Sequence, residues 1–471
     1  HPEYQMLRDP EAAPMEDSLT PIYPSTEGLQ QARLRALVEQ ALSILKQGGL
    51  PDLLPPLEVD GQNQPTLAEA LLYLHRPPPD ARLDQMASGA HPCQQRLAFE
   101  ELVAHQLSLR KLRERVRRGK ATILKPDPGL SDAYISSLPF SLTSAQDRVV
   151  GEILHDMARG EPMMRLVQGD VGSGKTVVAT AAALAAVGSG HQAALMAPTE
   201  LLAEQHLATL RGWLEPLGLE VGWLSGRSRG KEREQTLERL ASGECKLVVG
   251  THALFQDDVQ FARLGLAIID EQHRFGVHQR LALKQKGERG ELQPHQLIMS
   301  ATPIPRTLAM TAYADLDCSY IDERPPGRKP VTTVAIPETR RDEIVARVQR
   351  ACAEGRQAYW VCPLIDVSEN LEAQAAEETA SLLAEALQGL RVGLVHGRMK
   401  PADKEKVMSN FSQGKIDVLV ATTVIEVGVD MANASLMIVE NSERMGLAQL
   451  HQLRGRVGRG LAQSACVLMY K

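Results

Sequence analysis

The chain has 471 residues, of which 43% are hydrophobic and 23% are charged, a composition typical of globular proteins that excludes a fibrous or disordered chain. Its 52 lysine and arginine residues are outnumbered by 58 aspartate and glutamate residues, and this net charge of −6 argues against a histone-like or cationic membrane-surface protein. The length corresponds to about three domains at roughly 150 residues each.

Two further features bear on the compartment. No apolar run approaches the roughly 20 residues that span a bilayer, so we expect no membrane association. The chain contains six cysteines and none of them forms a C-x-x-C pair, which fits neither a disulfide framework nor a zinc site and is typical of a reducing compartment. We therefore expect a cytoplasmic protein. The sequence starts at His1 rather than at a methionine, so its start does not report on targeting.

Residues 1–139 have the pattern of helices separated by proline-rich connectors, such as Arg76-Pro77-Pro78-Pro79 and Lys125-Pro126-Asp127-Pro128. The clearest helix is predicted from about Gln94 to Arg118, and its last turns are strongly basic. These cations suit the negative end of a helix dipole, but they also suit contact with phosphate groups. Both interpretations stay open from the sequence.

From residue 140 to residue 328 short buried-type strands alternate with helical stretches. This alternation predicts a parallel sheet with helices on both faces. The predicted strands are Met164–Gln168, Ala193–Ala197, Lys246–Gly250, Leu266–Asp270 and Gln296–Ser300.

A proline-rich connector, Glu323 to Pro330, separates this unit from a second alternating unit over residues 329–471. The fold class predicted is therefore α/β, with two tandem parallel-sheet lobes preceded by a mainly helical connector. The second unit's predicted strands are Val331–Ile336, Ala358–Cys362, Val392–His396, Val418–Ala421, Leu436–Glu440 and Cys466–Tyr470.

The first unit carries a complete G-x-x-x-x-G-K-[ST] phosphate loop between a predicted strand and a predicted helix. Its residues are Gly169-Asp170-Val171-Gly172-Ser173-Gly174-Lys175-Thr176. In such a loop the backbone amides and the helix N-terminus surround the phosphates. We expect Lys175 to reach the β and γ phosphates and the Thr176 hydroxyl to hold Mg²⁺. The sequence therefore predicts binding of a nucleoside triphosphate.

Two acidic residues follow a later apolar strand, Leu266 to Ile269. Asp270 at the end of that strand is placed to hold Mg²⁺, and Glu271 is placed to polarise the attacking water. Together with the phosphate loop, these residues predict hydrolysis of the triphosphate.

The second unit contains an arginine motif, Gln452-Leu453-Arg454-Gly455-Arg456-Val457-Gly458-Arg459. A guanidinium group is permanently charged and binds phosphate oxygens through two parallel hydrogen bonds. When it is supplied across a cleft it stabilises the transferring phosphoryl group. Two lobes that must close for hydrolysis indicate a motor.

The ordered set of motifs resembles superfamily-two nucleic-acid helicases with two RecA-like lobes, over about residues 140–471. Three finer stretches, Asp270 to Val277, Thr302 to Leu308 and Gln449 to Arg456, resemble the RecG-type branched-DNA helicases. The related transcription-repair coupling translocase typically has Tyr in place of Ser173 and Glu-Gln in place of Gln272-His273. At both places this chain has the residues of the RecG type. The additional motifs are Ala197-Pro198-Thr199-Glu200, Gly250-Thr251-His252, Ser300-Ala301-Thr302, Val395-His396-Gly397-Arg398 and Ala421 to Asp430.

The resemblance implies roles for individual residues. Gln146 would read adenine and so favour ATP, while Gly428 and Asp430 would sense the nucleotide across the cleft. Arg456 and Arg459 would be arginine fingers, and Gln452 and His273 would link nucleotide state to lobe geometry. Ser300 and Thr302 would couple hydrolysis to movement. The implied DNA-backbone contacts are Pro198, Thr199, Gly250, Thr251, His252, Gly397, Arg398, Thr422 and Thr423.

The resemblance also implies ATP and Mg²⁺ as cofactors, branched or duplex DNA as partner, a monomeric motor and a bacterial source. RecG-type proteins carry a wedge domain before the start of this chain and a helical hairpin after its arginine motif, so the chain has the extent of a fragment. Two alternatives stay open: a duplex-DNA translocase of the coupling kind, and an inactive nucleotide-binding remnant.

Overall fold

The computed structural model describes residues 18–24, 30–56, 58–59, 61–117, 119–271, 292–301, 316–323, 325, 330–362, 369–422, 433–458 and 463–471. The chain divides into two compact units, His1–Lys111 and Leu112–Lys471. The long helix α4, Pro92–Arg117, continues across the boundary between them. The predicted domain boundaries at 139/140 and 328/329 stay predictions.

The first unit is mainly helical, as predicted. It contains α1 (Gln31–Lys46), α2 (Leu67–His75), α3 (Leu83–Ala87) and most of α4, with a short antiparallel pair of strands, β1 (Glu58–Val59) and β2 (Gln62–Asn63). A capping box between Thr66 and Glu69 starts α2, because it satisfies amides that have no partner inside the helix. The buried guanidinium of Arg96 pairs with Asp52 at 2.7 Å and with Glu100 at 2.6 Å. Burial of its charge is therefore compensated on both sides.

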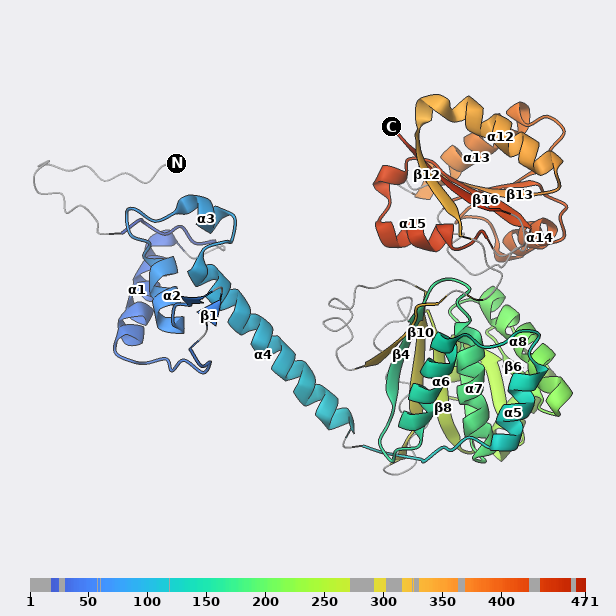
Figure 1. Ribbon diagram of the computed structural model, residues 1–471, viewed down its shortest axis with the longest axis horizontal. Helices are drawn as coiled ribbons and strands as arrows, with labels where there is room; N and C mark the ends of the chain where they lie inside the picture. The colour runs from blue at the N-terminus through green and yellow to red at the C-terminus, as the bar shows by residue number, and fades with distance from the viewer. Residues whose placement is uncertain are drawn as a thin grey trace, which may run out of the picture. The chain divides into compact units, whose positions relative to one another are not determined.

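The second unit begins with lobe 1, which is built on a seven-stranded sheet of the order β11-β4-β10-β8-β5-β7-β6, with every pair parallel. Alternate strand residues fall into two separate cores, so both faces of the sheet are covered. One core includes helices α5, α6, α7 and α8, of which Figure 1 shows α6 and α7 together on one face. The strands are β4 (Met164–Gly169), β5 (Gln192–Met196), β6 (Val221–Leu224), β7 (Leu247–Gly250), β8 (Leu264–Asp270), β10 (His295–Ser300) and β11 (Asp317–Ile321).

Two helices of lobe 1 precede β4 in the chain, and three follow β4, β5 and β6 in turn. They are α5 (Pro128–Ser137), α6 (Ser144–Met157), α7 (Lys175–Gly188), α8 (Glu200–Leu214) and α9 (Gly230–Ser242), with short 3₁₀ turns η2 (Glu215–Leu217) and η3 (His252–Phe255). A separate parallel pair joins β3 (Lys120–Ala121) to β9 (Leu292–Gln293). Because this pair connects the segment before α5 to the strand before β10, it fixes the start of lobe 1 to its sheet.

Lobe 2 repeats the same design with a six-stranded parallel sheet in the order β12-β17-β16-β13-β15-β14. Its two cores again lie on opposite faces, one with α14 and α15 and the other with α12 and α13. The elements are β12 (Thr332–Pro337), η5 (Glu338–Arg340), α12 (Arg341–Ala353), β13 (Gln357–Val361), α13 (Glu369–Ala386), β14 (Val392–Val395), α14 (Pro401–Ser412), β15 (Val418–Ala421), β16 (Ala434–Val439), η7 (Ser442–Arg444), α15 (Leu447–Arg454) and β17 (Ala465–Tyr470).

The predicted α/β class with two parallel-sheet lobes is confirmed, and each strand predicted from the sequence is present within one or two residues. Two strands of the large sheet were not predicted, β6 and β11, which lie at its two edges. Both are only partly buried. β6 is short and contains Gly222, and polar Asp317 and Ser319 interrupt β11, so neither matches the buried apolar pattern that identifies a central strand. Among the described residues no helix is long and apolar enough to cross a bilayer.

The two lobes share a buried glutamine at the start of an inner strand. Gln192 at the start of β5 donates from Nε2 to the carbonyls of Leu240 and Cys245 at 2.9 and 2.8 Å. Gln357 at the start of β13 donates in the same way to Phe411 and Ile416 at 2.6 and 2.7 Å. In both lobes the side chain satisfies carbonyls in the last turn of a later helix, α9 or α14, and just beyond it.

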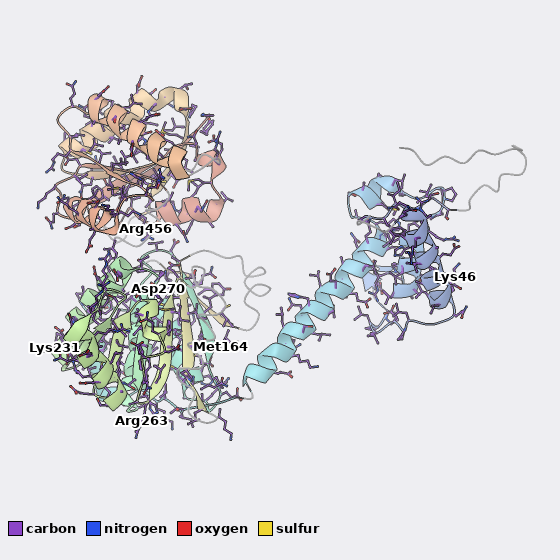
Figure 2. The ribbon with its side chains drawn as sticks, turned by 180° about the vertical axis from the view of Figure 1, so that it is seen from behind. Lys46, Met164, Lys231, Arg263, Asp270 and Arg456 are labelled. Atoms are coloured by element: carbon purple, nitrogen blue, oxygen red, sulfur yellow. The ribbon has the colours of Figure 1, made fainter. Side chains whose placement is uncertain are left out.

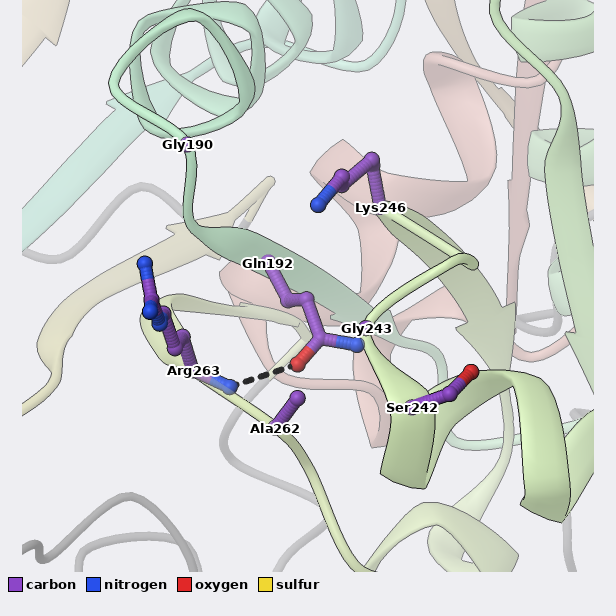
Figure 3. A pocket seen from close by; sticks show the side chains of 7 residues that line it. All are labelled: Gly190, Gln192, Ser242, Gly243, Lys246, Ala262 and Arg263. Carbon is purple, nitrogen blue, oxygen red and sulfur yellow. Dashed lines mark hydrogen bonds between the residues drawn. The ribbon is translucent and has the colours of Figure 1, made fainter.

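In lobe 1 this glutamine lies at a pocket of about 160 Å³ lined by Gly190, Gln192, Ser242, Gly243, Lys246, Ala262 and Arg263. Figure 3 shows the Gln192 oxygen accepting a hydrogen bond from the backbone amide of Arg263, at 2.8 Å. Both polar atoms of the Gln192 side-chain amide are therefore hydrogen-bonded to backbone groups. The pocket is thus a structural feature at the amino end of β5.

Candidate active site

The phosphate loop, Gly169–Thr176, connects the end of β4 to the start of α7. Two of its glycines have positive φ, 75° at Gly172 and 87° at Gly174, a conformation that other residues adopt only with strain. The Lys175 ammonium donates to the carbonyls of Gly169 at 2.7 Å and Asp170 at 3.0 Å. The loop therefore folds around its own lysine, and Lys175 and Thr176 stand in the first turn of α7, as the sequence predicts.

Gln146 is buried against this loop. Its Oε1 accepts from the Thr143 amide at 2.9 Å, which closes a capping box at the start of α6. Its Nε2 donates to the Ser173 carbonyl at 2.8 Å. The side chain thus ties α6 to the phosphate loop, a connection that the sequence motifs do not reveal, and its role in reading adenine stays a prediction.

Asp270 lies at the end of β8, buried, where Figure 2 labels it. His206 of α8 contacts its Oδ2 through Nε2 at 2.8 Å. Burial opposes ionisation of the carboxyl, but the hydrogen bond from His206 and the positive charge of Lys175 outweigh it, so the pKa of Asp270 is held below its usual value. An ionised oxygen ligand is therefore present beside the phosphate loop. His206 was not predicted, because it lies 64 residues before Asp270 in the chain.

Glu271 has a φ of 51°, one of two non-glycine residues among those described with positive φ. Its backbone amide donates to the Met299 carbonyl at 2.9 Å, and its carboxylate accepts from the Ala301 amide at 3.3 Å. These bonds hold the strained residue against the end of β10, where buried Ser300 lies. Burial, and then the negative charge of Asp270, raise the pKa of Glu271. Strain and a raised pKa at one carboxyl are typical of functional sites.

Lobe 2 reaches this site through α15 and the turn after it. His451 forms a hydrogen bond from Nε2 to Oδ1 of Asp170 in the phosphate loop. The charge of Arg456 is among those that act on Glu271, where it favours the ionised carboxylate. Gly455 lies so close that an added Cβ would come within 2.7 Å of the Val171 Cβ. Gln452 and Arg456 are therefore carried on the segment that faces the phosphate loop, and the His451 contact was not predicted.

Several predicted site residues lie outside the described part of the chain, and their roles stay predictions. They are His273, Thr302, Thr423, Gly428, Asp430 and Arg459.

The described residues of the predicted DNA contacts lie where strands end. Pro198 and Thr199 follow β5, and the side chain of Thr199 caps α8 by accepting from the Leu202 amide at 3.4 Å. Gly250 ends β7, and an added Cβ there would stand 2.0 Å from the Leu224 carbonyl, so only glycine fits. His252 begins η3. Because the sheets are parallel, these segments gather at the carboxyl edge of lobe 1.

Lobe 2 presents the matching segments. Gly397 and Arg398 follow β14, and Thr422 follows β15. The hydroxyls of Thr422 and of Thr251 in lobe 1 are buried and have no hydrogen-bond partner among the described residues. A buried hydroxyl without a partner is costly, so each position suits an external acceptor or donor.

Family models match both lobes. Residues 143–311 match the DEAD/DEAH box helicase family, and residues 342–460 match the helicase conserved C-terminal domain. The structure of S. cerevisiae Dbp5 bound to RNA and ADP BeF3 covers 73% of this chain with a TM-score of 0.53 at 16% identity, a likeness in fold alone. The phosphate loop in one RecA-like lobe and the arginine motif in the other define the class, a two-lobed ATP-driven helicase.

Comparison with whole proteins narrows this class. The chain is 61% identical to the ATP-dependent DNA helicase RecG of Escherichia coli K12, covering 100% of this chain and 68% of the relative. It is 43% identical to RecG of Bacillus subtilis strain 168, covering 96% of this chain and 65% of that protein. The structure of RecG bound to a three-way DNA junction covers 96% of this chain and 58% of its own, at 40% identity and a TM-score of 0.73. The chain belongs to the RecG family of ATP-dependent DNA helicases.

Proposed function

We propose that this chain is the ATP-hydrolysing motor of a helicase that acts on branched DNA, in the rescue of stalled forks and in recombination. The observation that carries the proposal is the joint placement of Lys175, Asp270 and Glu271 at one edge of lobe 1, with Arg456 of lobe 2 acting on Glu271. The family relationship gives the substrate, since a RecG structure at 40% identity is bound to a three-way DNA junction.

The residues at the site fit Mg²⁺. Asp270 offers an ionised oxygen and Thr176 a hydroxyl, both ligands that Mg²⁺ prefers, at the edge where the triphosphate would lie. Among the described residues no cluster of three or more His, Cys, Asp or Glu could hold a metal alone, which suits an ion shared with the nucleotide. When bound, Mg²⁺ would neutralise charge on the phosphate oxygens.

The chain's own residues divide the remaining work. The loop amides and Lys175 would hold the β and γ phosphates, and Glu271 would orient the attacking water. Arg456, brought from lobe 2, would stabilise charge on the transferring phosphoryl group. Because this arginine comes from the other lobe, hydrolysis and release would change the contact between lobes, and Thr251 and Thr422 would carry that change to the DNA backbone.

The proposal is tested by measuring the ATPase rate with fork, duplex and single-stranded DNA at two salt concentrations. We expect DNA to stimulate the ATPase rate, most strongly with the fork. We also expect weaker DNA affinity at the higher salt concentration, because binding releases counterions from the DNA phosphates and this release is less favourable when salt is high. ATP binding without any stimulation by DNA would contradict the proposal and identify an inactive remnant. Equal stimulation by unbranched duplex and by fork would instead favour a duplex translocase of the coupling kind.

A further inference from the structure

The hydrogen bond between His206 and Asp270 was not predicted from the sequence motifs, and the proposed hydrolysis gives His206 no role. Both side chains are nearly inaccessible, at 8% and 10% exposure, and their hydrogen bond is 2.8 Å long. The partner of the imidazole is the carboxylate that we assign to Mg²⁺, rather than a backbone carbonyl or a surface acid.

We propose that His206 is a positioning residue that holds the Asp270 carboxylate in its metal-binding orientation and connects the metal site to the DNA-facing start of α8. This inference deepens the proposed function and rests on it. The ligand concerned is a divalent cation shared with the nucleotide.

The geometry of the carboxylate supports the first part. A carboxylate at a strand end can rotate about its last bond, and a hydrogen bond from Nε2 to Oδ2 restricts that rotation. A carboxylate can only accept a hydrogen bond, so in this role Nε2 of His206 is the donor to Oδ2. Ligating carboxylates in metal sites are commonly held by such bonds, and loss of the outer partner typically costs 10- to 100-fold in metal affinity.

The helix that carries His206 supports the second part. Helix α8 starts at Glu200, directly after Pro198 and Thr199, which are predicted to contact the DNA backbone. His206 is six residues further on, about 9 Å along the helix axis at ~1.5 Å per residue. Ala203, His206, Leu210 and Leu214 form the buried face of α8. A packed helix moves as a rigid body, so displacement of its first turn by DNA would move the imidazole against Asp270.

The experiment measures Mn²⁺ binding by electron paramagnetic resonance on the full chain with a non-hydrolysable ATP analogue. His206→Leu removes the donor, and we expect its Mn²⁺ affinity to fall 10- to 100-fold. His206→Gln places an amide N–H near the position of Nε2, and we expect it to restore the affinity to within about threefold of the parent, whereas the shorter His206→Asn does not. These three variants separate the donor from the general effect of changing a buried residue.

A second buried histidine of lobe 1 provides the matched control. His295 accepts from the Met163 amide at Nδ1, at 3.1 Å, and contacts the Thr122 carbonyl through Nε2, at 2.7 Å, so it holds only backbone. We expect His295→Leu to lower the melting temperature without changing Mn²⁺ affinity. If His206→Leu leaves Mn²⁺ affinity unchanged, or if both histidine variants weaken it equally, the positioning role is wrong.

The connection to DNA is tested in the same assay by adding fork DNA. We expect DNA to change the Mn²⁺ affinity of the parent chain and to change that of His206→Leu at least threefold less. An equal effect of DNA in both proteins would overturn the connection through α8. Asp270→Ala tests the proposed function separately from the role of His206. Normal Mn²⁺ affinity in Asp270→Ala would show that Asp270 is not a metal ligand, which would overturn the proposed metal site on which this inference rests.

Discussion

At the residue scale, Glu271 is the residue of the site whose conformation and charge are least favourable. Glu271 combines positive φ, partial burial and a raised pKa, and it is held by the Met299 carbonyl and the Ala301 amide. A strained backbone of this kind costs about 1–3 kcal/mol and persists only where surrounding contacts fix it. Asp270 next to it is instead stabilised in its ionised form. The pKa values of these two adjacent carboxyls are therefore shifted in opposite directions, down for Asp270 and up for Glu271, as expected of a metal ligand and a base.

The first prediction concerns this base. We expect Glu271→Gln to lower DNA-stimulated ATP turnover by about 10²- to 10⁴-fold, because an amide cannot accept a proton from water. ATP binding should persist, since the phosphate loop is untouched. Lys175→Ala should instead reduce binding as well as turnover. Single-turnover hydrolysis and equilibrium nucleotide binding distinguish the two, and turnover that survives Glu271→Gln would show that another group is the base.

The second prediction concerns the cysteines, all six of which are free thiols. Burial raises the pKa of Cys352 to about 11 and those of Cys362 and Cys466 to about 12. The thiolate is the reactive form, so these three should resist iodoacetamide at pH 8.5 in the folded protein. Mass spectrometry should detect their labelling only after denaturation, with the half-buried Cys318 as the internal comparison. Rapid labelling of Cys466 in the folded chain would contradict its burial in lobe 2.

At the element scale, the phosphate loop and the helix after it form one unit. Helix α7 is flanked by two glycines of positive φ: its N-cap Gly174, at 87°, and Gly190, at 77°, which follows the C-cap Ser189. The surroundings of these glycines differ. A Cβ on Gly174 would stand 2.2 Å from Nε2 of Gln146, whereas a Cβ on Gly190 would meet nothing within 4 Å. Only the first glycine is therefore required both by the backbone and by a close neighbour.

This difference gives the third prediction. Gly190→Ala should cost only the left-handed backbone penalty, about 1–2 kcal/mol. Gly174→Ala should cost that and also displace Gln146 from the Ser173 carbonyl, so we expect it to weaken ATP affinity as well as stability. Nucleotide titration and thermal unfolding of both variants provide the measurement. Equal ATP affinities would show that the contact between Gln146 and the loop is dispensable.

The fourth prediction uses the glutamine repeated in the two lobes. Gln192→Leu removes the donor for two buried carbonyls, and Gln357→Leu does the same in lobe 2. We expect each change to lower the free energy of unfolding by about 1–3 kcal/mol for every buried group left unpaired. The side chain of exposed Gln413 donates to the Ser409 hydroxyl at the surface. It gives a control in Gln413→Leu, which should stay within about 0.5 kcal/mol of the parent. The free energies of unfolding are measured by denaturant titration. Equal values for all three variants would show that Gln192 and Gln357 do not stabilise the lobes through these hydrogen bonds.

At the scale of the whole molecule, the described residues of the two lobes meet through both polar and apolar contacts. Besides His451 with Asp170, Arg227 of lobe 1 pairs with Glu405 of lobe 2 at 3.2 Å, and both side chains are about half exposed. Exposed pairs of this kind contribute about 0–1 kcal/mol. Leu201 of α8 adds an apolar contact with the core of lobe 2. The exposed ion pair would therefore do little to oppose the lobe movement that we propose to accompany ATP hydrolysis.

The fifth prediction belongs to this scale, because it concerns a residue of one lobe that acts in the other. We expect Arg456→Ala to reduce ATP turnover by about 10³- to 10⁵-fold, the usual effect of losing an arginine finger. ATP binding should be nearly retained. Arg444→Ala, at an exposed arginine of the same lobe, should leave turnover close to that of the parent. A loss of turnover in both variants, or in neither, would mean that Arg456 is not the finger.

The sequence by itself determined the two parallel-sheet lobes and the residues of the phosphate loop, Asp270, Glu271 and the arginine motif. These features are local, since a strand, a glycine-rich turn or an acidic strand end is specified by neighbours in the chain. Only the tertiary structure decided which distant residues complete the site: His206 on Asp270, Gln146 on the loop and His451 on Asp170. A histidine or glutamine inside a helix has the same sequence pattern whether it packs in a core or holds a catalytic group, because its partner comes from another part of the chain.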